Sequence, residues 1–230
     1  MLSRRRFLEV GGVSAGALVT PSLALAASAD DTSLPPSIAR LKSRKAEAQP
    51  ITREERQDRQ DRARKLMVEN GLDAIVLMEG TSLRYFTGIR WWGGERLFAL
   101  VLPAKGKSFY VCPAFEEGRA HEQMASSPDG ADADVRVWQE DESPYELVAQ
   151  GLKQHGISTG KIGMEETIRF VFVDGISKAS PHATISSAAG VTAGCRMVKS
   201  AHEIALMRLA SQVTLAVYEA VYQALREGMT

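Results

Sequence analysis

The sequence has few cysteines, no excess charge of either sign and no nucleotide-binding motif. Two cysteines among 230 residues are too few for a disulfide-dense scaffold. The 28 basic residues balance 28 acidic ones, which argues against a nucleic-acid-binding protein. Neither a P-loop nor a glycine-rich dinucleotide fingerprint after a strand is present. What remains is an ordinary composition, 44% hydrophobic, with room for one or two domains.

A zinc-protease helix is also missing. The H-E-x-x-H motif needs a second histidine one turn after the first, but Ala125 follows His121-Glu122 at that position and Leu206 follows His202-Glu203. Both histidines are therefore interpreted as surface residues of helices. No metal ligand and no catalytic residue is assigned.

The two cysteines, Cys112 and Cys195, lack C-x-x-C spacing. Free cysteines are usually buried, so two buried thiols are favoured. A single disulfide is the alternative in an oxidising compartment.

Residues 1–29 have the pattern of an export signal. Ser3–Leu8 reads S-R-R-R-F-L, which resembles the twin-arginine signal, and an uncharged run with a small-residue cluster at Ala24–Ala29 follows. Pro21 interrupts this run, so its weak hydrophobicity suits a signal better than an uncleaved anchor, the alternative. We find no other stretch long and apolar enough to span a bilayer, and expect a periplasmic or secreted bacterial protein with no stable membrane span after processing.

The rest of the chain alternates between strand and helix patterns, which predicts an α/β fold. Residues 30–50 are polar and contain three prolines, as in a linker or extended arm. Capping boxes predict helix starts at Thr52, Ser143 and Ser200. The expected strands cover residues 73–78, 97–102, 108–112, 135–138, 161–164 and 183–186, and the expected helices cover 53–71, 114–125, 144–156, 167–177 and 200–227.

The segment Gly80–Arg96 is interpreted as a loop between two strands. It combines adjacent tryptophans with several arginines, a combination that suits a rim binding carboxylates or peptides. The alternative is that Tyr85, Phe86 and Trp91 simply pack beneath a long loop.

Six short segments stand in order along the chain: Gly71–Ala74, Leu83–Gly88, Glu95–Leu97, Pro113–Glu117, Arg196–Ile204 and Gly228–Thr230. Together they resemble the N-terminal domain of the creatinase, prolidase and Xaa-Pro aminopeptidase family. The motif at Pro113–Glu117 favours the aminopeptidase branch, and Arg196–Ile204 resembles the family's entry into a linker helix.

This resemblance implies a mixed β-sheet flanked by helices over residues 51–198 and a linker helix over 199–230. It further implies a second, catalytic domain of the pita-bread fold, absent from these residues, in which two Asp, one His and two Glu bind two divalent ions (Mn, Zn or Co). Those metals activate a water for peptide hydrolysis. The present chain is then the N-terminal half of such an enzyme, inactive alone and without a cofactor of its own.

In this family the N-terminal domain builds the oligomer, a dimer or tetramer, and reaches over a neighbouring subunit's active site. The resemblance places that role on the loop Ile89–Arg96. We expect Arg90, Trp91, Trp92 and Arg96 to contact proline-containing peptide substrates in trans. Two alternatives stay open: a free-standing exported peptide-binding module, and a fragment of a creatinase-like C–N hydrolase.

Overall fold

The computed structural model describes residues 33–229, so the predicted export signal lies outside the described residues. The chain forms two compact units. The larger unit is Ser43–Leu215, and the smaller one combines the segments on either side of it.

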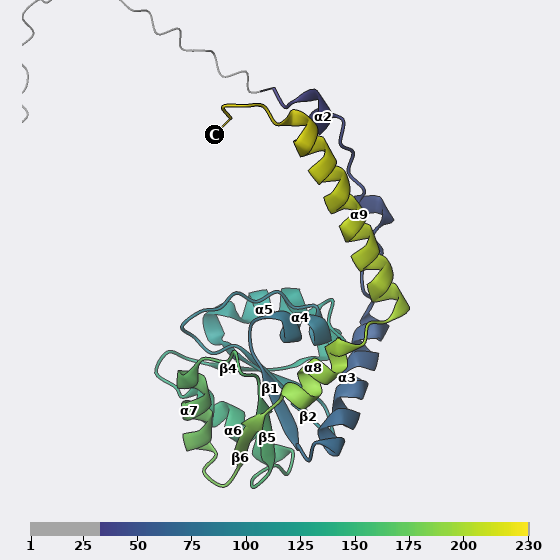
Figure 1. Ribbon diagram of the computed structural model, residues 1–230. Helices are drawn as coiled ribbons and strands as arrows, with labels where there is room; N and C mark the ends of the chain where they lie inside the picture. Colours follow the sequence, from purple (N-terminus) through teal and green to yellow (C-terminus); the bar gives the residue numbers. More distant parts are fainter. Residues whose placement is uncertain (1–32, 230) are drawn as a thin grey trace, which may run out of the picture. The chain divides into compact units, whose positions relative to one another are not determined.

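The larger unit is built around a six-stranded sheet with the strand order β4-β3-β2-β1-β5-β6 (Figure 1). β2 runs antiparallel to both of its neighbours, and the other pairs are parallel. The mixed sheet expected from the resemblance is therefore confirmed. The strands are β1 (Ala74–Leu77), β2 (Ala99–Pro103), β3 (Phe109–Pro113), β4 (Asp134–Trp138), β5 (Lys161–Met164) and β6 (Thr184–Ser187).

Helices cover both faces of this sheet. The α-helices of the larger unit are α3 (Arg53–Glu69), α4 (Thr81–Thr87), α5 (Glu117–Met124), α6 (Pro144–Gln154), α7 (Phe170–Ala179) and α8 (Ala189–Met197), followed by α9 (Ala201–Ala224), which continues into the smaller unit. Short 3₁₀ turns are η1 (Lys45–Glu47), η2 (Ala114–Glu116) and η3 (Gly130–Asp132). One core cluster joins α3, α4, α5 and α8 to the sheet, and a second joins α6 and α7 to it.

The alternation of side chains along β1 explains how one strand serves both cores. Ile75 and Leu77 belong to the cluster with α3 and α4, whereas Ala74 and Val76 belong to the cluster with α6 and α7. Because successive side chains point to opposite faces, a strand covered on both sides is apolar throughout. This is why the short apolar runs in the sequence predicted the central strands correctly.

The capping signals located the starts of three helices. The Thr52 Oγ1 accepts from the Glu55 amide at 3.2 Å while the Thr52 amide donates to Glu55 Oε2 at 2.8 Å. Ser200 and Glu203 form the same reciprocal pair at 3.1 and 2.8 Å. At α6, Ser143 Oγ accepts from the amide three residues later at 3.3 Å.

Two α-helices of the larger unit were not expected. Gly80–Arg96 is only partly a loop, because α4 occupies its first half and ends at Gly88, whose φ of 83° lies in the left-handed region that favours glycine. α8 is rich in small residues and has no side-chain cap that would mark its start. The predicted arm also contains η1 and the four-residue α2 (Pro36–Ala39), and α9 ends at Ala224, three residues earlier than expected.

α9 contradicts one expectation about membranes. Within the described residues it is one helix that is long and apolar enough to cross a bilayer, with a mean hydropathy of 1.3 and 6% of that window buried. The expectation that no segment after the signal meets this criterion is therefore wrong. Length and composition do not separate a membrane span from a helix that packs on protein.

The smaller unit has its own contacts. Ser37 Oγ donates to the Ala220 carbonyl at 2.7 Å, and Ala220 and Ala224 are buried. The larger apolar side chains of α9 in this unit, including Val217 and Val221, remain exposed.

Candidate functional site

The loop Ile89–Arg96 lies at the carboxyl edge of the sheet. β1 leads into α4, the loop follows, and the chain returns antiparallel along β2, so the loop stands above the end of β1. The carboxyl ends of β3, β4, β5 and β6 lie at this same edge. In open α/β sheets, ligands bind beyond the carboxyl ends of the strands.

Trp91 anchors the loop in the core. Its ring stacks on Phe98 with 3.8 Å between centroids and 12° between planes, and the Arg119 guanidinium lies 4.2 Å from its centroid on the indole. Only 8% of the residue is exposed. Such stacking and cation–π contacts stabilise a buried tryptophan, so in this chain the geometry gives Trp91 a packing role.

Two side chains from other elements hold the loop backbone. Gln123 on α5 accepts from the Arg90 amide at 3.1 Å through its Oε1. Arg169, just before α7, donates to the Gly94 carbonyl at 2.5 Å. A backbone fixed at both ends in this way is pre-organised and loses little entropy on meeting a ligand.

Arg96 closes the loop with an ion pair. Its Nε and NH2 atoms lie 2.5 and 3.0 Å from the two carboxylate oxygens of Glu140, and its guanidinium lies 5.2 Å from the ring centroid of Phe115. The hydrogen bond to Arg96 lowers the pKa of Glu140. Bidentate geometry fixes the orientation of the guanidinium, while its face remains at the surface beside an exposed aromatic ring.

Of the four residues expected to contact substrate, three are exposed and one is buried. Trp92 is 78% exposed, and Arg90 and Arg96 are exposed as well. Trp91 points into the core, where Phe86 is also buried and Tyr85 is half-buried. The alternative that Tyr85, Phe86 and Trp91 pack beneath the loop therefore describes the structure. The supporting residues Gln123, Glu140 and Arg169 were missed because no local pattern connects them to the loop.

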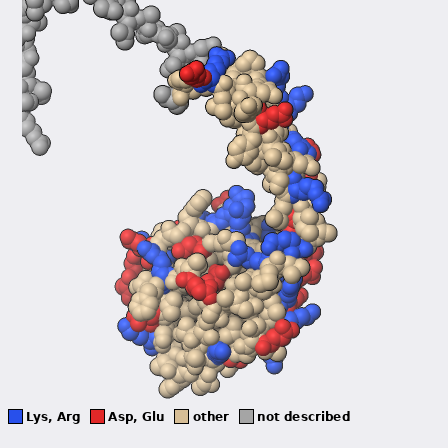
Figure 2. All heavy atoms as spheres, viewed as in Figure 1, with Lys and Arg blue, Asp and Glu red and all other residues tan. Residues whose placement is uncertain are grey.

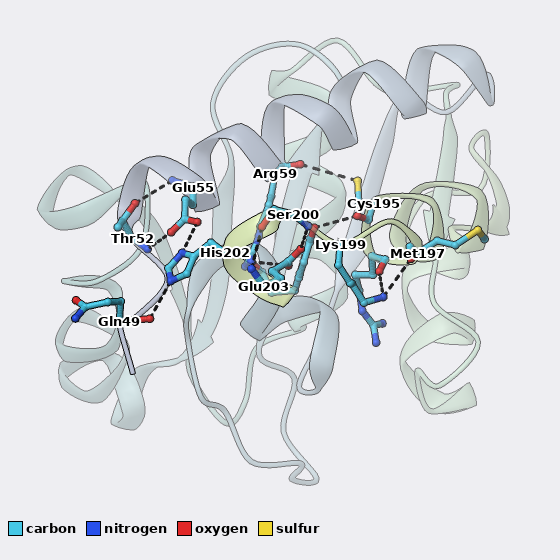
Figure 3. Close-up of polar contacts among 12 residues, drawn as sticks. Gln49, Thr52, Glu55, Arg59, Cys195, Met197, Lys199, Ser200, His202 and Glu203 are labelled. Carbon is cyan, nitrogen blue, oxygen red and sulfur yellow. Dashed lines mark hydrogen bonds and ion pairs between the residues drawn. The ribbon is translucent and has the colours of Figure 1, made fainter. Parts of the chain in front are cut away.

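A second polar site joins the beginnings of α3 and α9 (Figure 3). Each helix starts with a capping box, and the glutamate of each box uses its other oxygen to reach the other helix. Glu55 Oε1 on α3 lies 2.7 Å from His202 Nδ1, and Glu203 Oε1 on α9 lies 2.7 Å from Arg59 NH2. We call these four side chains the α9 clamp.

Arg59 extends the clamp to α4. Its NH1 donates to the Tyr85 carbonyl at 2.9 Å, and its guanidinium lies 4.0 Å from the centroid of the Tyr85 ring. The Tyr85 hydroxyl donates to the Cys195 carbonyl at 3.0 Å on α8. One arginine thereby connects the C-terminal end of α4 with the first turn of α9, and the tyrosine carries the connection to α8.

Neither site has the donor set of a metal centre. Among residues 33–229, no group of three or more His, Cys, Asp and Glu side chains is arranged to hold a metal ion. His121 is an exposed residue of α5 as expected, whereas His202, interpreted as a surface residue, is half-buried in the clamp. On the visible face of the molecule, basic and acidic side chains are intermixed (Figure 2).

Both cysteines are free and buried, which is the favoured one of the two alternatives. Burial, followed by the nearby Glu116 and Glu117 carboxylates, raises the pKa of Cys112 to about 12, and burial also raises the pKa of Cys195.

Because the thiolate is the reactive species, we expect neither thiol of the native protein to react with iodoacetamide near neutral pH. Mass spectrometry should find two adducts after unfolding in urea, and rapid labelling of the native protein would contradict this.

Comparison with known proteins gives a consistent result. Residues 59–198 match the family model of the Creatinase/Prolidase N-terminal domain. The chain is 27% identical over 163 residues to a putative dipeptidase of Bacillus subtilis, covering 70% of this chain and 43% of that protein. It is also 25% identical to a Xaa-Pro dipeptidase of Lactobacillus delbrueckii, covering 74% and 45% respectively.

Solved structures agree with these matches. A dipeptidase from Pyrococcus horikoshii superposes with a TM-score of 0.62 at 28% identity, over 72% of this chain and 44% of that one. Dipeptidase PepE from Mycobacterium ulcerans superposes with a TM-score of 0.58 at 32% identity, over 65% and 38%. The chain thus spans less than half the length of the curated relatives it matches.

Proposed function

This chain belongs to the creatinase/prolidase N-terminal domain family, and from that premise we propose that it is the gating domain of an exported Xaa-Pro aminopeptidase-like enzyme. It is homologous to the N-terminal domains of Xaa-Pro dipeptidases. In the proposed role the domain builds a dimer or tetramer and presents the loop Ile89–Arg96 to proline-containing peptides at a neighbouring subunit's active site.

The observation that supports this proposal is the exposure of Trp92 on a fixed loop. Its neighbour Trp91 is buried, and Arg90, Gly94 and Arg96 are each held by a side chain from another element. A large aromatic side chain on a rigid backbone provides contact area at little entropic cost. Trp92 is therefore the proposed anchor for the apolar part of a peptide, with the two arginines beside it.

Hydrolysis is proposed to occur outside the described residues. Following the family resemblance, two divalent metal ions (Mn, Zn or Co) would be held by a pita-bread domain outside the described residues. The residues of this chain would orient the peptide and restrict access to short substrates, and they would move no proton. Export by the twin-arginine route, to the periplasm or beyond, belongs to the same proposal and has its basis in Ser3–Leu8.

Replacing Trp92 tests the gating role. In the active oligomer that carries this domain, Trp92→Ala should raise KM for an Xaa-Pro peptide about tenfold or more, the effect of losing an aromatic anchor, with a smaller change in kcat. The matched control is Phe170→Ala, because Phe170 is 79% exposed on α7. Equal kinetics for the two variants, on short and long peptides alike, would overturn the proposal.

The isolated chain separates gating from the alternative of a free-standing peptide-binding module. We expect residues 30–230, with added manganese, to release no N-terminal residue from an Xaa-Pro peptide. A peptide titration followed by tryptophan fluorescence should show no saturable binding, because the other half of the proposed site is absent. Saturable binding that Trp92→Ala removes would favour the binding module. Hydrolysis by the isolated chain would overturn both the gating proposal and the binding module.

A further inference from the structure

Both ring nitrogens of His202 face hydrogen-bond acceptors. Nδ1 lies 2.7 Å from Glu55 Oε1, and Nε2 lies 3.1 Å from the backbone carbonyl oxygen of Gln49 (Figure 3). Neither acceptor supplies a proton: Gln49 presents a backbone carbonyl oxygen, and the lowered pKa of Glu55 keeps its side chain ionised near neutral pH. Both contacts are therefore complete only when each nitrogen of the imidazole carries a hydrogen.

A neutral imidazole has one N–H and cannot satisfy this arrangement. Whichever tautomer forms, one bare nitrogen faces an oxygen lone pair, and the contact with either Glu55 or Gln49 is lost. The imidazolium donates to both. The positions of the two acceptors thus select the charged form of His202 by geometry.

The charges around His202 come from several elements. α3 contributes the Glu55 carboxylate and the Arg59 guanidinium, and Arg59 is occupied by Glu203. Arg44, just before the 3₁₀ turn η1, pairs with Glu47 of that turn, and α9 itself contributes Arg208 to the wall of the adjoining cavity.

That cavity, about 270 Å³, opens beside the ring, so protons exchange freely with solvent. His202 also lies in the first turn of α9, where the helix dipole disfavours a cation. The Glu55 carboxylate is the group that offsets this.

We propose that His202 is a proton-operated latch that fastens the first turns of α9 to α3. When protonated, it bridges the α3 capping glutamate and the chain segment that precedes α3. When neutral, it releases one of the two. The second half of the clamp, Arg59 with Glu203, does not change over the same pH range, because an arginine keeps its charge. Loss of the proton from His202 therefore loosens the base of α9 without unfolding the sheet.

The direction of the pH effect follows from the neighbours. The hydrogen bond from His202 to Glu55, more than any other contact, raises the pKa of His202 above its ordinary value, and the pKa of Glu55 is lowered. A group whose pKa is higher in the folded state stabilises that state fully below its unfolded pKa of about 6.5. The contribution disappears as pH rises through the folded value. The base of α9 is thus held more tightly at mildly acidic than at mildly alkaline pH.

The test measures the base of α9 locally. Hydrogen exchange of a peptide covering residues 203–209 should show protection factors several-fold lower at about pH 8.5 than at about pH 5.5, values on either side of the ordinary histidine pKa. His202→Gln is neutral at every pH, so its protection should be low and independent of pH. Because it leaves the Thr52–Glu55 capping box intact, this variant should fold.

Two further measurements keep the result specific. In an NMR titration, the midpoint of His202 should lie above the ordinary histidine value of about 6.5 and fall towards it in Glu55→Gln. His182→Gln is the matched control and should leave the exchange profile unchanged.

The readout is local rather than global because the latch joins only the first turns of α9 to α3. Protection at 203–209 that does not change with pH, or that changes equally in His202→Gln, would overturn the latch.

Discussion

Gly151→Ala is expected to destabilise the larger unit by about 1–3 kcal/mol, the usual cost of overpacking a core. Gly151 lies in α6 directly over β3. A Cβ atom there would stand 2.3 Å from the Phe109 ring and 2.8 Å from the Arg136 guanidinium. The Phe109 ring cannot move aside, because it is fully buried and lies between that guanidinium, 4.3 Å from its centroid, and the stacked ring of His155. Urea unfolding monitored by circular dichroism measures the loss.

The matched control is the same substitution at another helical glycine. Gly118 lies in α5 and an added Cβ would meet no atom within 4 Å. There alanine should stabilise the protein by about 0.4–1 kcal/mol, because it restricts the unfolded chain without a clash. The two variants thus differ in sign although the chemistry is identical. Stabilisation by Gly151→Ala would show that α6 can move away from β3, contrary to the close packing described.

The parts of the fold that sequence reasoning located are those in which local signals agree. The capping boxes at Thr52 and Ser200 set the starts of α3 and α9, since the boxed residues are neighbours in the chain. The apolar runs of β1, β2 and β3 predicted buried strands because both faces of those strands are covered. α4 and α8 were missed because they lack such signals. Neither helix has a side-chain cap, and the seven residues of α4 hold too few turns to display a period.

For the candidate site, the sequence does not determine which side chains of the loop are exposed. Trp91 and Trp92 are adjacent and chemically identical, yet one is buried and the other exposed. What decides between them is the stack with Phe98 and the guanidinium of Arg119, and Arg119 lies 28 residues away in the chain. The partners of Gly94 and Arg96 are more distant still, 75 and 44 residues along the chain. A sequence can indicate that such a loop is rich in aromatic and basic residues, but the sheet decides which of them faces solvent.

Arg59→Met is expected to cost about 2–4 kcal/mol, somewhat below the about 3–5 kcal/mol of a fully buried ion pair that loses one partner. The Arg59 and Glu203 side chains keep 13% and 15% exposure, which accounts for the difference. Methionine fills the space of the arginine stem but donates nothing. It therefore leaves Glu203 Oε1 and the Tyr85 carbonyl without their donor and removes the cation from the Tyr85 ring.

A double-mutant cycle separates the ion pair from the contacts with α4. Glu203→Gln removes the charge on α9 alone and should cost less than Arg59→Met, because Arg59 keeps the Tyr85 carbonyl and ring. The double variant should cost less than the sum of the two, since the pair can be lost only once. Arg64→Met is the surface control: its partner Asp61 is 52% exposed, and such pairs contribute at most about 1 kcal/mol. Strict additivity would mean that the Arg59–Glu203 contact contributes nothing to holding α9.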